Sequence, residues 1–190
     1  GGLYLEALAK VDCIVMDKTG TVTFGKQDVS DVLRVMGQGS EVTEKEILRL
    51  AAAIEKHSEH SIASAIIGRS KEEGVEITET EGFEYLIGKG ITGIVEGKNV
   101  IFGNQRLMEG KGVAIPAFVK TKALELEGEG KTVLFLAKDF EVQGIVAVAD
   151  VLRDDVPETI KELKKIGIKR LILLTGDNQR VASSASKKLG

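Results

Sequence analysis

Two short apolar runs, far apart in the chain, each end in a polar turn that contains a glycine. The first run is VDCIVM over 11–16, which leads into Asp17 and then KTGTVTFG. The second lies in KRLILLTGD over 169–177. Short runs that are rich in β-branched residues and bounded by glycine turns are typical of buried strands. With helical patterns beside them, these two runs favour a parallel α/β sheet.

The segment between the two runs has a different pattern. Residues 41–56 carry apolar side chains at helical spacing behind a capping box of Thr43 and Glu46. The other predicted elements are a helix over 59–73, strands near 83–87, 91–96 and 99–103, a helix over 116–127, strands on either side of KDFE, a helix over 154–166, a strand in KRLILLTGD and a helix in NQRVASSASKKLG. A tight turn at Gly97-Lys98 is expected to join two of the strands.

These patterns predict an α/β domain that is interrupted by an inserted domain. Residues 1–26 and 149–190 would form the interrupted domain, and residues 27–148 an α+β insertion with a mostly antiparallel sheet. The chain is expected to cross between the two near Gly25-Lys26 and near Ala149-Asp150.

Composition and charge argue against several classes of protein. The net charge is −3 with both signs spread along 190 residues, so no basic patch points to nucleic acid. Cys13 is the only cysteine, which excludes an internal disulfide, and two histidines without a CxxC pair argue against structural zinc. No apolar run reaches the roughly 18 residues of a spanning helix, and no signal peptide is present, so the chain is expected to be soluble.

Asp17 carries the clearest chemistry in the first run. A carboxylate at the carboxyl end of a parallel strand lies where α/β sheets bind ligands, and it can attack as a nucleophile. Lys18, Thr21 and Thr23 offer charge and hydroxyl donors for a phosphoryl group. For a lone aspartate, a turn-capping role is the commoner explanation. A second strand end with TGD at 175–177 favours the functional one, because two such ends side by side would form a phosphate pocket.

The two polar turns together resemble a known family. DKTGTVT at 17–23 with TGDN at 175–178 resembles the P-type ATPases, ion pumps whose phosphorylation domain belongs to the haloacid-dehalogenase superfamily. The resemblance implies that Asp17 takes the γ-phosphoryl group of ATP and that Asp17 and the Thr19 carbonyl hold Mg²⁺. By the same resemblance the catalytic residues are Asp17, Lys18, Thr19, Thr175, Gly176 and Asp177.

Thr19 separates this sequence from the phosphatases of the same superfamily. Those enzymes place an aspartate two residues after the nucleophile, where it acts as general acid and then as general base. Thr19 can do neither at neutral pH. The aspartyl phosphate is therefore expected to persist, as a pump requires.

The middle of the chain resembles the nucleotide-binding domain of the heavy-metal-transporting P-type ATPases. The resemblance rests on HSEHSIASAI at 57–66 and GKGITG at 88–93. The aromatic platform of the larger cation pumps is not evident in this sequence. It implies that the nucleotide lies against Glu59, His60, Gly88, Gly90, Gly103 and Asn104. Ser61 stands where the family usually has proline, which puts the nucleotide affinity in question.

Other interpretations of these residues are weaker. GKGITG also fits a dinucleotide fingerprint, but strands follow it where a helix should. His57 and His60 lie three residues apart, but a third metal ligand is missing nearby. Without the family resemblance, His60 is expected to be a helix-surface residue and not a ligand contact. Asp150 and Arg153 are expected either near the phosphate pocket or at the hinge.

The expected function is that of an ATP-binding catalytic fragment of a heavy-metal cation pump, with ATP and Mg²⁺ as cofactors. Its expected partners are a transmembrane metal-transport domain and an actuator domain at the cytoplasmic face of a membrane, into which the fragment itself is not inserted. The family's later aspartate and lysine lie outside the sequence, so weak activity is expected. Two alternatives stay open: a soluble phosphatase, which Thr19 opposes, and a non-catalytic nucleotide-binding regulator, which leaves DKTGT unexplained. The metal stays open between copper and zinc, cadmium or cobalt.

Overall fold

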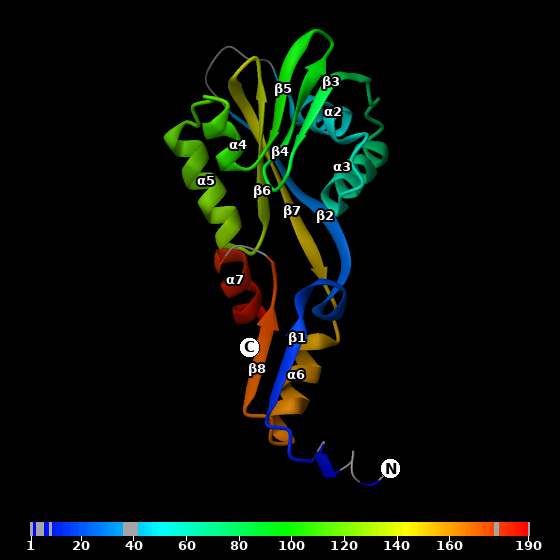
Figure 1. Ribbon diagram of the computed structural model, residues 1–190, viewed down its shortest axis with the longest axis vertical. Coiled ribbons are helices and arrows are strands. Elements are labelled where there is room, and N and C mark those ends of the chain that lie inside the picture. Colours follow the sequence, from blue (N-terminus) through cyan, green and yellow to red (C-terminus); the bar gives the residue numbers. More distant parts are fainter. Residues whose placement is uncertain (1, 3–5, 8, 36–41, 177–178, 190) are drawn as a thin grey trace. The chain divides into compact units, whose positions relative to one another are not determined.

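The computed structural model describes residues 2, 6–7, 9–35, 42–176 and 179–189. The chain forms two compact units (Figure 1): unit 1 comprises residues 1–26 and 150–190, and unit 2 comprises residues 27–149. Among the helices of the described residues, none combines the length and apolar character needed to cross a bilayer.

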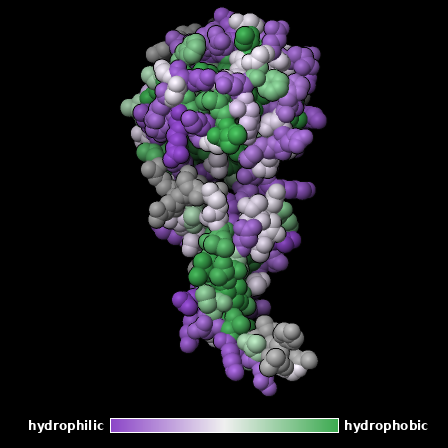
Figure 2. All heavy atoms as spheres, viewed as in Figure 1, coloured by the Kyte–Doolittle hydropathy of each residue, from purple (hydrophilic) through white to green (hydrophobic). Residues whose placement is uncertain are grey.

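Unit 1 is built on two parallel strands. Its elements are β1 (Cys13–Asp17), the single turn η1 (Lys18–Val22), α6 (Val156–Lys165), β8 (Arg170–Leu174) and α7 (Gln179–Leu189). β1 pairs with β8 from Cys13↔Arg170 to Asp17↔Leu174. One face of the pair packs on a small core around Val22, Ile160 and Leu189. The other leaves Val15, Ile172 and Leu174 exposed, and Figure 2 shows the apolar stripe over these strands.

Unit 2 is built on a six-stranded sheet in the order β2-β7-β6-β5-β4-β3. The strands are β2 (Thr23–Arg34), β3 (Thr80–Leu86), β4 (Gly90–Val95), β5 (Lys98–Gly103), β6 (Thr132–Lys138) and β7 (Glu141–Leu152). The helices are α2 (Glu44–Glu55), α3 (Ser61–Glu72), α4 (Gln105–Gly110) and α5 (Ala117–Gly128). Every pair from β3 to β7 is antiparallel.

Helices cover both faces of this sheet. Its central strands therefore have apolar residues at nearly every position of their sequence. Along β6, Leu134 and Leu136 belong to the core under α2 and α3. Their neighbours Val133, Phe135 and Ala137 belong to the core under α4 and α5. Side chains alternate between the faces of a strand, so a strand buried on both faces needs apolar residues at every position.

The predicted fold class is confirmed, with local corrections. The Thr43 hydroxyl caps α2 by accepting a hydrogen bond from the Glu46 amide at 3.2 Å, as the capping box predicts. The turn between β4 and β5 is Glu96-Gly97 and not Gly97-Lys98, because Val95 pairs directly with Lys98. Both turn residues have positive φ angles, 52° and 72°, as a two-residue hairpin loop requires.

Candidate functional site

The ends of β1 and β8 lie side by side in unit 1. Asp17 pairs with Leu174, so Thr175 is the next residue at the same edge of the sheet. The Asp17 side chain is exposed and has no hydrogen-bond or ion-pair partner among the described residues, whereas Thr175 is half-buried and has one. Gly176 is exposed, and Asp177 lies outside the described residues. The structure therefore brings together the two strand ends that the sequence assigned to one pocket.

Lys18 is turned inward from this edge. Its Nζ atom lies 2.6 Å from Asp150 Oδ2, and the two side chains are only 7% and 6% exposed. The second oxygen, Asp150 Oδ1, is buried and accepts no hydrogen bond from the described residues. A buried ion pair whose carboxylate is only partly satisfied fixes the Lys18 charge in the turn that follows Asp17.

The turn after Asp17 is held by one buried hydroxyl. Thr23 Oγ1 accepts hydrogen bonds from the Gly20 and Gly25 amides, each at 3.3 Å, and donates one to the Lys18 carbonyl at 3.2 Å. Thr19 and Gly20 depart from helical dihedral angles inside η1, and Thr19 is exposed. Thr23, which the sequence offered as a phosphoryl donor, therefore serves to shape the loop.

Unit 2 contains a largely apolar cavity of about 450 Å³. Its lining residues are Ile54, His57, Ser58, Glu59, His60, Phe83, Tyr85 and Ile91. They come from the end of α2, the loop before α3 and the edge hairpin β3–β4. Glu59 and His60, predicted at the adenine end of the nucleotide, are both among them. A concave apolar site with a few polar groups is the usual form of a small-molecule pocket.

His60 is the N-cap of α3, and not a residue on the helix surface. Its Nδ1 atom accepts a hydrogen bond from the Ile62 amide at 3.4 Å, which leaves Nε2 as the donor of the neutral ring. Ser61, in the place of the family's proline, donates its hydroxyl to Gln27 Oε1 at 3.2 Å. That bond ties the loop to β2.

The predicted glycines and Asn104 do not line this cavity; they lie at the turn between β3 and β4 and at the end of β5. Gly90 pairs with Gly103, and a Cβ atom on Gly90 would lie 2.2 Å from the Phe102 carbonyl oxygen. Gly90 is therefore required by the close approach of β4 and β5, whatever the ligand. Gly88 has a φ angle of +69° and open space around it. Asn104 caps α4 and donates to the Gly88 carbonyl at 2.9 Å, which fixes this turn.

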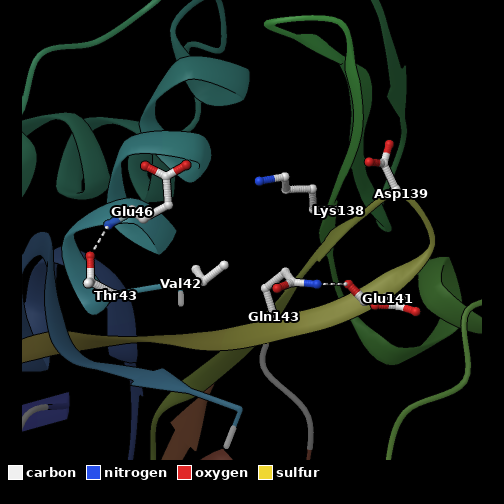
Figure 3. Close-up of a pocket in the computed structure, with 7 residues that line it drawn as sticks. All are labelled: Val42, Thr43, Glu46, Lys138, Asp139, Glu141 and Gln143. Atoms are coloured by element: carbon white, nitrogen blue, oxygen red, sulfur yellow. Dashed lines mark hydrogen bonds between the residues drawn. The ribbon is translucent and has the colours of Figure 1, made fainter. Parts of the chain in front are cut away.

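A second cavity of unit 2, of about 570 Å³, lies between the start of α2 and the β6–β7 turn (Figure 3). Its lining residues are Val42, Thr43, Glu46, Lys138, Asp139, Glu141 and Gln143. Thr43 Oγ1 accepts from the Glu46 amide, and Gln143 Nε2 donates to the Glu141 carbonyl at 3.1 Å. The Glu46 carboxylate binds Arg49 at 2.7 Å. Thr43, Glu46 and Gln143 therefore have partners within the protein, and the sequence placed no site residue here.

The family is settled by comparison with known sequences. The profile of the haloacid dehalogenase-like hydrolases matches residues 11–190. The chain belongs to the haloacid dehalogenase-like hydrolase family. The family match spans both strand ends of unit 1 and the whole of unit 2.

Within the haloacid dehalogenase-like hydrolases, the chain is similar to metal-transporting P-type ATPases, which confirms the resemblance. It is 41% identical over 185 residues to the probable copper-exporting P-type ATPase of Archaeoglobus fulgidus, covering 97% of this chain and 22% of that protein. The copper-exporting P-type ATPase of Bacillus subtilis is 40% identical over 190 residues, covering 100% and 23%. The crystal structure of a zinc-transporting PIB-type ATPase in the E2.Pi state gives a TM-score of 0.77 at 34% identity, covering 100% and 30%. The chain thus spans less than a third of each protein.

The structure adds a buried carboxyl group that the sequence did not single out, adjoining two residues of the cavity. Glu55 ends α2, one position after Ile54 of the cavity, and is buried. Burial raises the pKa of its carboxyl, against a smaller lowering by a hydrogen bond with Ser58, which lines the cavity. Its Oε2 atom has no hydrogen-bond partner among the described residues. A carboxylate directly after the apolar run LAAAI at 50–54 is the sequence signal that could have found it.

The donor set around Asp17 fits a magnesium ion. Mg²⁺ takes hard oxygen ligands and is usually held by one or two carboxylates together with substrate phosphates and water. Asp17 offers an exposed carboxylate at the end of β1, and Thr19 a backbone carbonyl in the adjoining turn. The described residues hold no group of three or more His, Cys, Asp or Glu side chains that could bind a metal.

Proposed function

We propose that the chain is the ATP-binding catalytic region of a heavy-metal cation pump and that Asp17 is its phosphoryl acceptor. The observation that carries this proposal is the parallel pairing of β1 and β8, which puts the Asp17 carboxylate beside Thr175 at one sheet edge. The identity with copper-exporting P-type ATPases over the whole chain supports the same assignment.

The phosphoryl transfer begins at Asp17. One of its carboxylate oxygens attacks the γ-phosphorus of ATP, a new O–P bond forms, and the bond from that phosphorus to the β–γ bridging oxygen breaks, so that ADP leaves. The Thr175 hydroxyl would hydrogen-bond the phosphoryl group. Asp17 and the Thr19 carbonyl would hold Mg²⁺, which neutralises phosphate charge when it is bound.

Lys18 and Thr19 determine the fate of the transferred phosphoryl group. The Lys18 ammonium, held by Asp150, keeps a positive charge at the turn where the negative phosphoryl group arrives. Thr19 is exposed at the position from which a phosphatase would activate water. A hydroxyl cannot act as general base at neutral pH, so the acyl phosphate persists.

The nucleotide base is assigned to the largely apolar cavity of unit 2. Glu59 and His60 line it, and the Nε2–H group of His60 is free of the capping bond that its Nδ1 atom accepts. The open backbone at Gly88 allows close approach of a phosphate or ribose.

In the longer protein this reaction would be coupled to metal export across a membrane. Because the chain covers 22% and 23% of its copper-exporting relatives, the transmembrane metal-transport domain and the actuator domain are proposed partners. The catalytic region would lie at the cytoplasmic face of that membrane, and the isolated chain would turn over ATP weakly.

Calorimetry of the full 190-residue chain with ATP and Mg²⁺ tests the assignment, together with hydrolysis of a phosphate monoester. We expect saturable ATP binding that survives Asp17→Asn, and no hydrolysis of the monoester. Monoester turnover by the wild-type chain that disappears in Asp17→Asn would assign a phosphatase in place of a pump.

A further inference from the structure

Ser61 is the first residue of α3, directly after the N-cap His60. Proline is favoured at this position of a helix, because its missing amide hydrogen would have had no partner there and its fixed φ angle suits the first turn. A proline also restricts the residue before it to an extended conformation. His60 has φ and ψ angles of −71° and 147°, which lie in that extended region. His60 therefore has the backbone conformation that a proline would impose, although a serine follows it.

The hydrogen bonds of the loop before α3 differ in their reach. The His60 amide donates to Ser58 Oγ at 3.3 Å, and the Ile62 amide donates to His60 Nδ1 at 3.4 Å. Both distances exceed the roughly 3.2 Å at the upper end of the usual range for an amide donor. The Ser61 hydroxyl donates to Gln27 Oε1 at 3.2 Å, on a strand 34 residues earlier in the chain. Of these three bonds, the last is the one that connects the loop to the sheet.

Apolar packing brings Ser61 and Gln27 together. Gln27 and Val29 lie on the same face of β2, because side chains alternate along a strand. Val29 is 4% exposed and belongs to the core against which Ile62, the residue after Ser61, also packs. Figure 1 shows α3 beside β2. The bond between Ser61 and the half-buried Gln27 thus lies next to a contact that the core already fixes.

We propose that Ser61 and Gln27 form a positioning pair, whose hydrogen bond holds Glu59 and His60 in the arrangement that binds the nucleotide. The inference rests on the proposed nucleotide binding of unit 2. Glu59 and His60 line the largely apolar cavity, whereas Ser61 and Gln27 do not, so the pair acts through the loop. Without the bond, the loop has more conformations in the free chain. Binding must then order it at a cost in entropy, which lowers the affinity.

A double-mutant cycle, with ATP binding to the full chain measured by calorimetry, tests the pair. We expect Ser61→Ala and Gln27→Ala each to weaken ATP binding roughly threefold, and the double variant to lose no more than either one. Ser61→Pro should bind ATP at least as tightly as the wild type, and adding Gln27→Ala to it should cost nothing. Thr121→Ala is the matched control, because it removes an exposed hydroxyl that bonds the Ala117 carbonyl at 3.2 Å on α5.

The mobility of the His60 amide distinguishes positioning from a general effect on stability. NMR relaxation of the free chain should show a lower order parameter at His60 in Ser61→Ala and in Gln27→Ala, and the wild-type value in Ser61→Pro. Denaturant melts of the same variants should differ little from the wild type, because Ser61 is exposed and Gln27 is half-buried.

The outcomes separate the positioning pair from the proposed function. If the wild-type chain binds ATP, and folded Ser61→Ala and Gln27→Ala variants bind it equally tightly, the pair is wrong and nucleotide binding stands. Additive losses in the double variant would also overturn the pair, because two residues that share one bond can lose it only once. If the wild-type chain does not bind ATP, both the pair and the proposed function are overturned.

Discussion

Lys18 Nζ and Asp150 Oδ2 lie 2.6 Å apart, and the two side chains are only 7% and 6% exposed. The pair joins the turn after β1 to the segment by which the chain returns to unit 1. Asp150 was expected either near the phosphate pocket or at the hinge, and its contact with Lys18 links it to the turn that follows Asp17. Asp150 acts by holding the Lys18 ammonium in place. The proposed phosphoryl transfer uses that positive charge.

Asp150→Asn should therefore destabilise unit 1. The substitution leaves the Lys18 ammonium buried without its carboxylate, and we expect the free energy of unfolding to fall by about 3 kcal/mol. Asp154→Asn is the control, since Asp154 is exposed, and should change it by less than about 0.5 kcal/mol. Denaturant melts of both variants measure the difference. Equal stabilities would show that Asp150 does not hold Lys18.

Thr23→Val tests the hydroxyl that shapes the turn after Asp17. Valine keeps the volume but leaves the Gly20 and Gly25 amides without their acceptor at a position that is 0% exposed. We expect a loss of about 2 kcal/mol in the free energy of unfolding. Thr21→Val, at an exposed threonine of the same turn, should stay near the wild type. If the two variants melt alike, the Thr23 hydrogen bonds are not what holds the turn.

On the proposed mechanism, Thr19→Asp should shorten the lifetime of the phosphoenzyme formed at Asp17. The new carboxylate supplies the general base that Thr19 lacks, a contribution of about a hundredfold or more in rate. The measurement is the decay of radiolabelled phosphoenzyme in the longer protein after a chase with unlabelled ATP. Thr19→Asn controls for size and polarity and should decay at the wild-type rate. An unchanged lifetime in Thr19→Asp would place the control of hydrolysis elsewhere.

Glu55 should make stability depend on pH. Burial raises the pKa of its carboxyl above the ordinary value that it has in the unfolded chain. The folded state therefore binds more protons between these two values, and the free energy of unfolding falls as pH rises through the raised pKa. Glu55→Gln removes that fall, so we expect its stability relative to wild type to increase from about pH 4 upward until it levels off. Parallel curves for the two proteins would contradict this.

Most helices and strands could be predicted because they follow from local sequence patterns, namely hydrophobic periodicity and helix capping. The capping box of Thr43 and Glu46, and the apolar runs of β6 and β7, all appear where periodicity placed them. β2 was missed because charged residues such as Asp28 and Asp31 interrupt the apolar pattern of this edge strand. α4 was missed because six residues are too few for a helical period to show.

The candidate site was predictable where a family motif marks it and not where the fold assembles it. Glu59 and His60 could be named from sequence, and both line the cavity. Phe83 and Tyr85 could be predicted only as strand residues. The register shift against β4, which determines where their side chains lie, cannot be read from the local sequence. Glu55 was missed for the same reason, because its burial depends on packing across elements.

The most direct test of the proposed mechanism is phosphorylation of Asp17 in the longer protein. The protein is incubated with ATP labelled at the γ-phosphate and with Mg²⁺, quenched in acid, and treated with hydroxylamine, which cleaves acyl phosphates. We expect one labelled, hydroxylamine-sensitive phosphoenzyme that is absent in Asp17→Asn, together with loss of ATP turnover. Full labelling and turnover in Asp17→Asn would contradict the assignment of Asp17 as the phosphoryl acceptor.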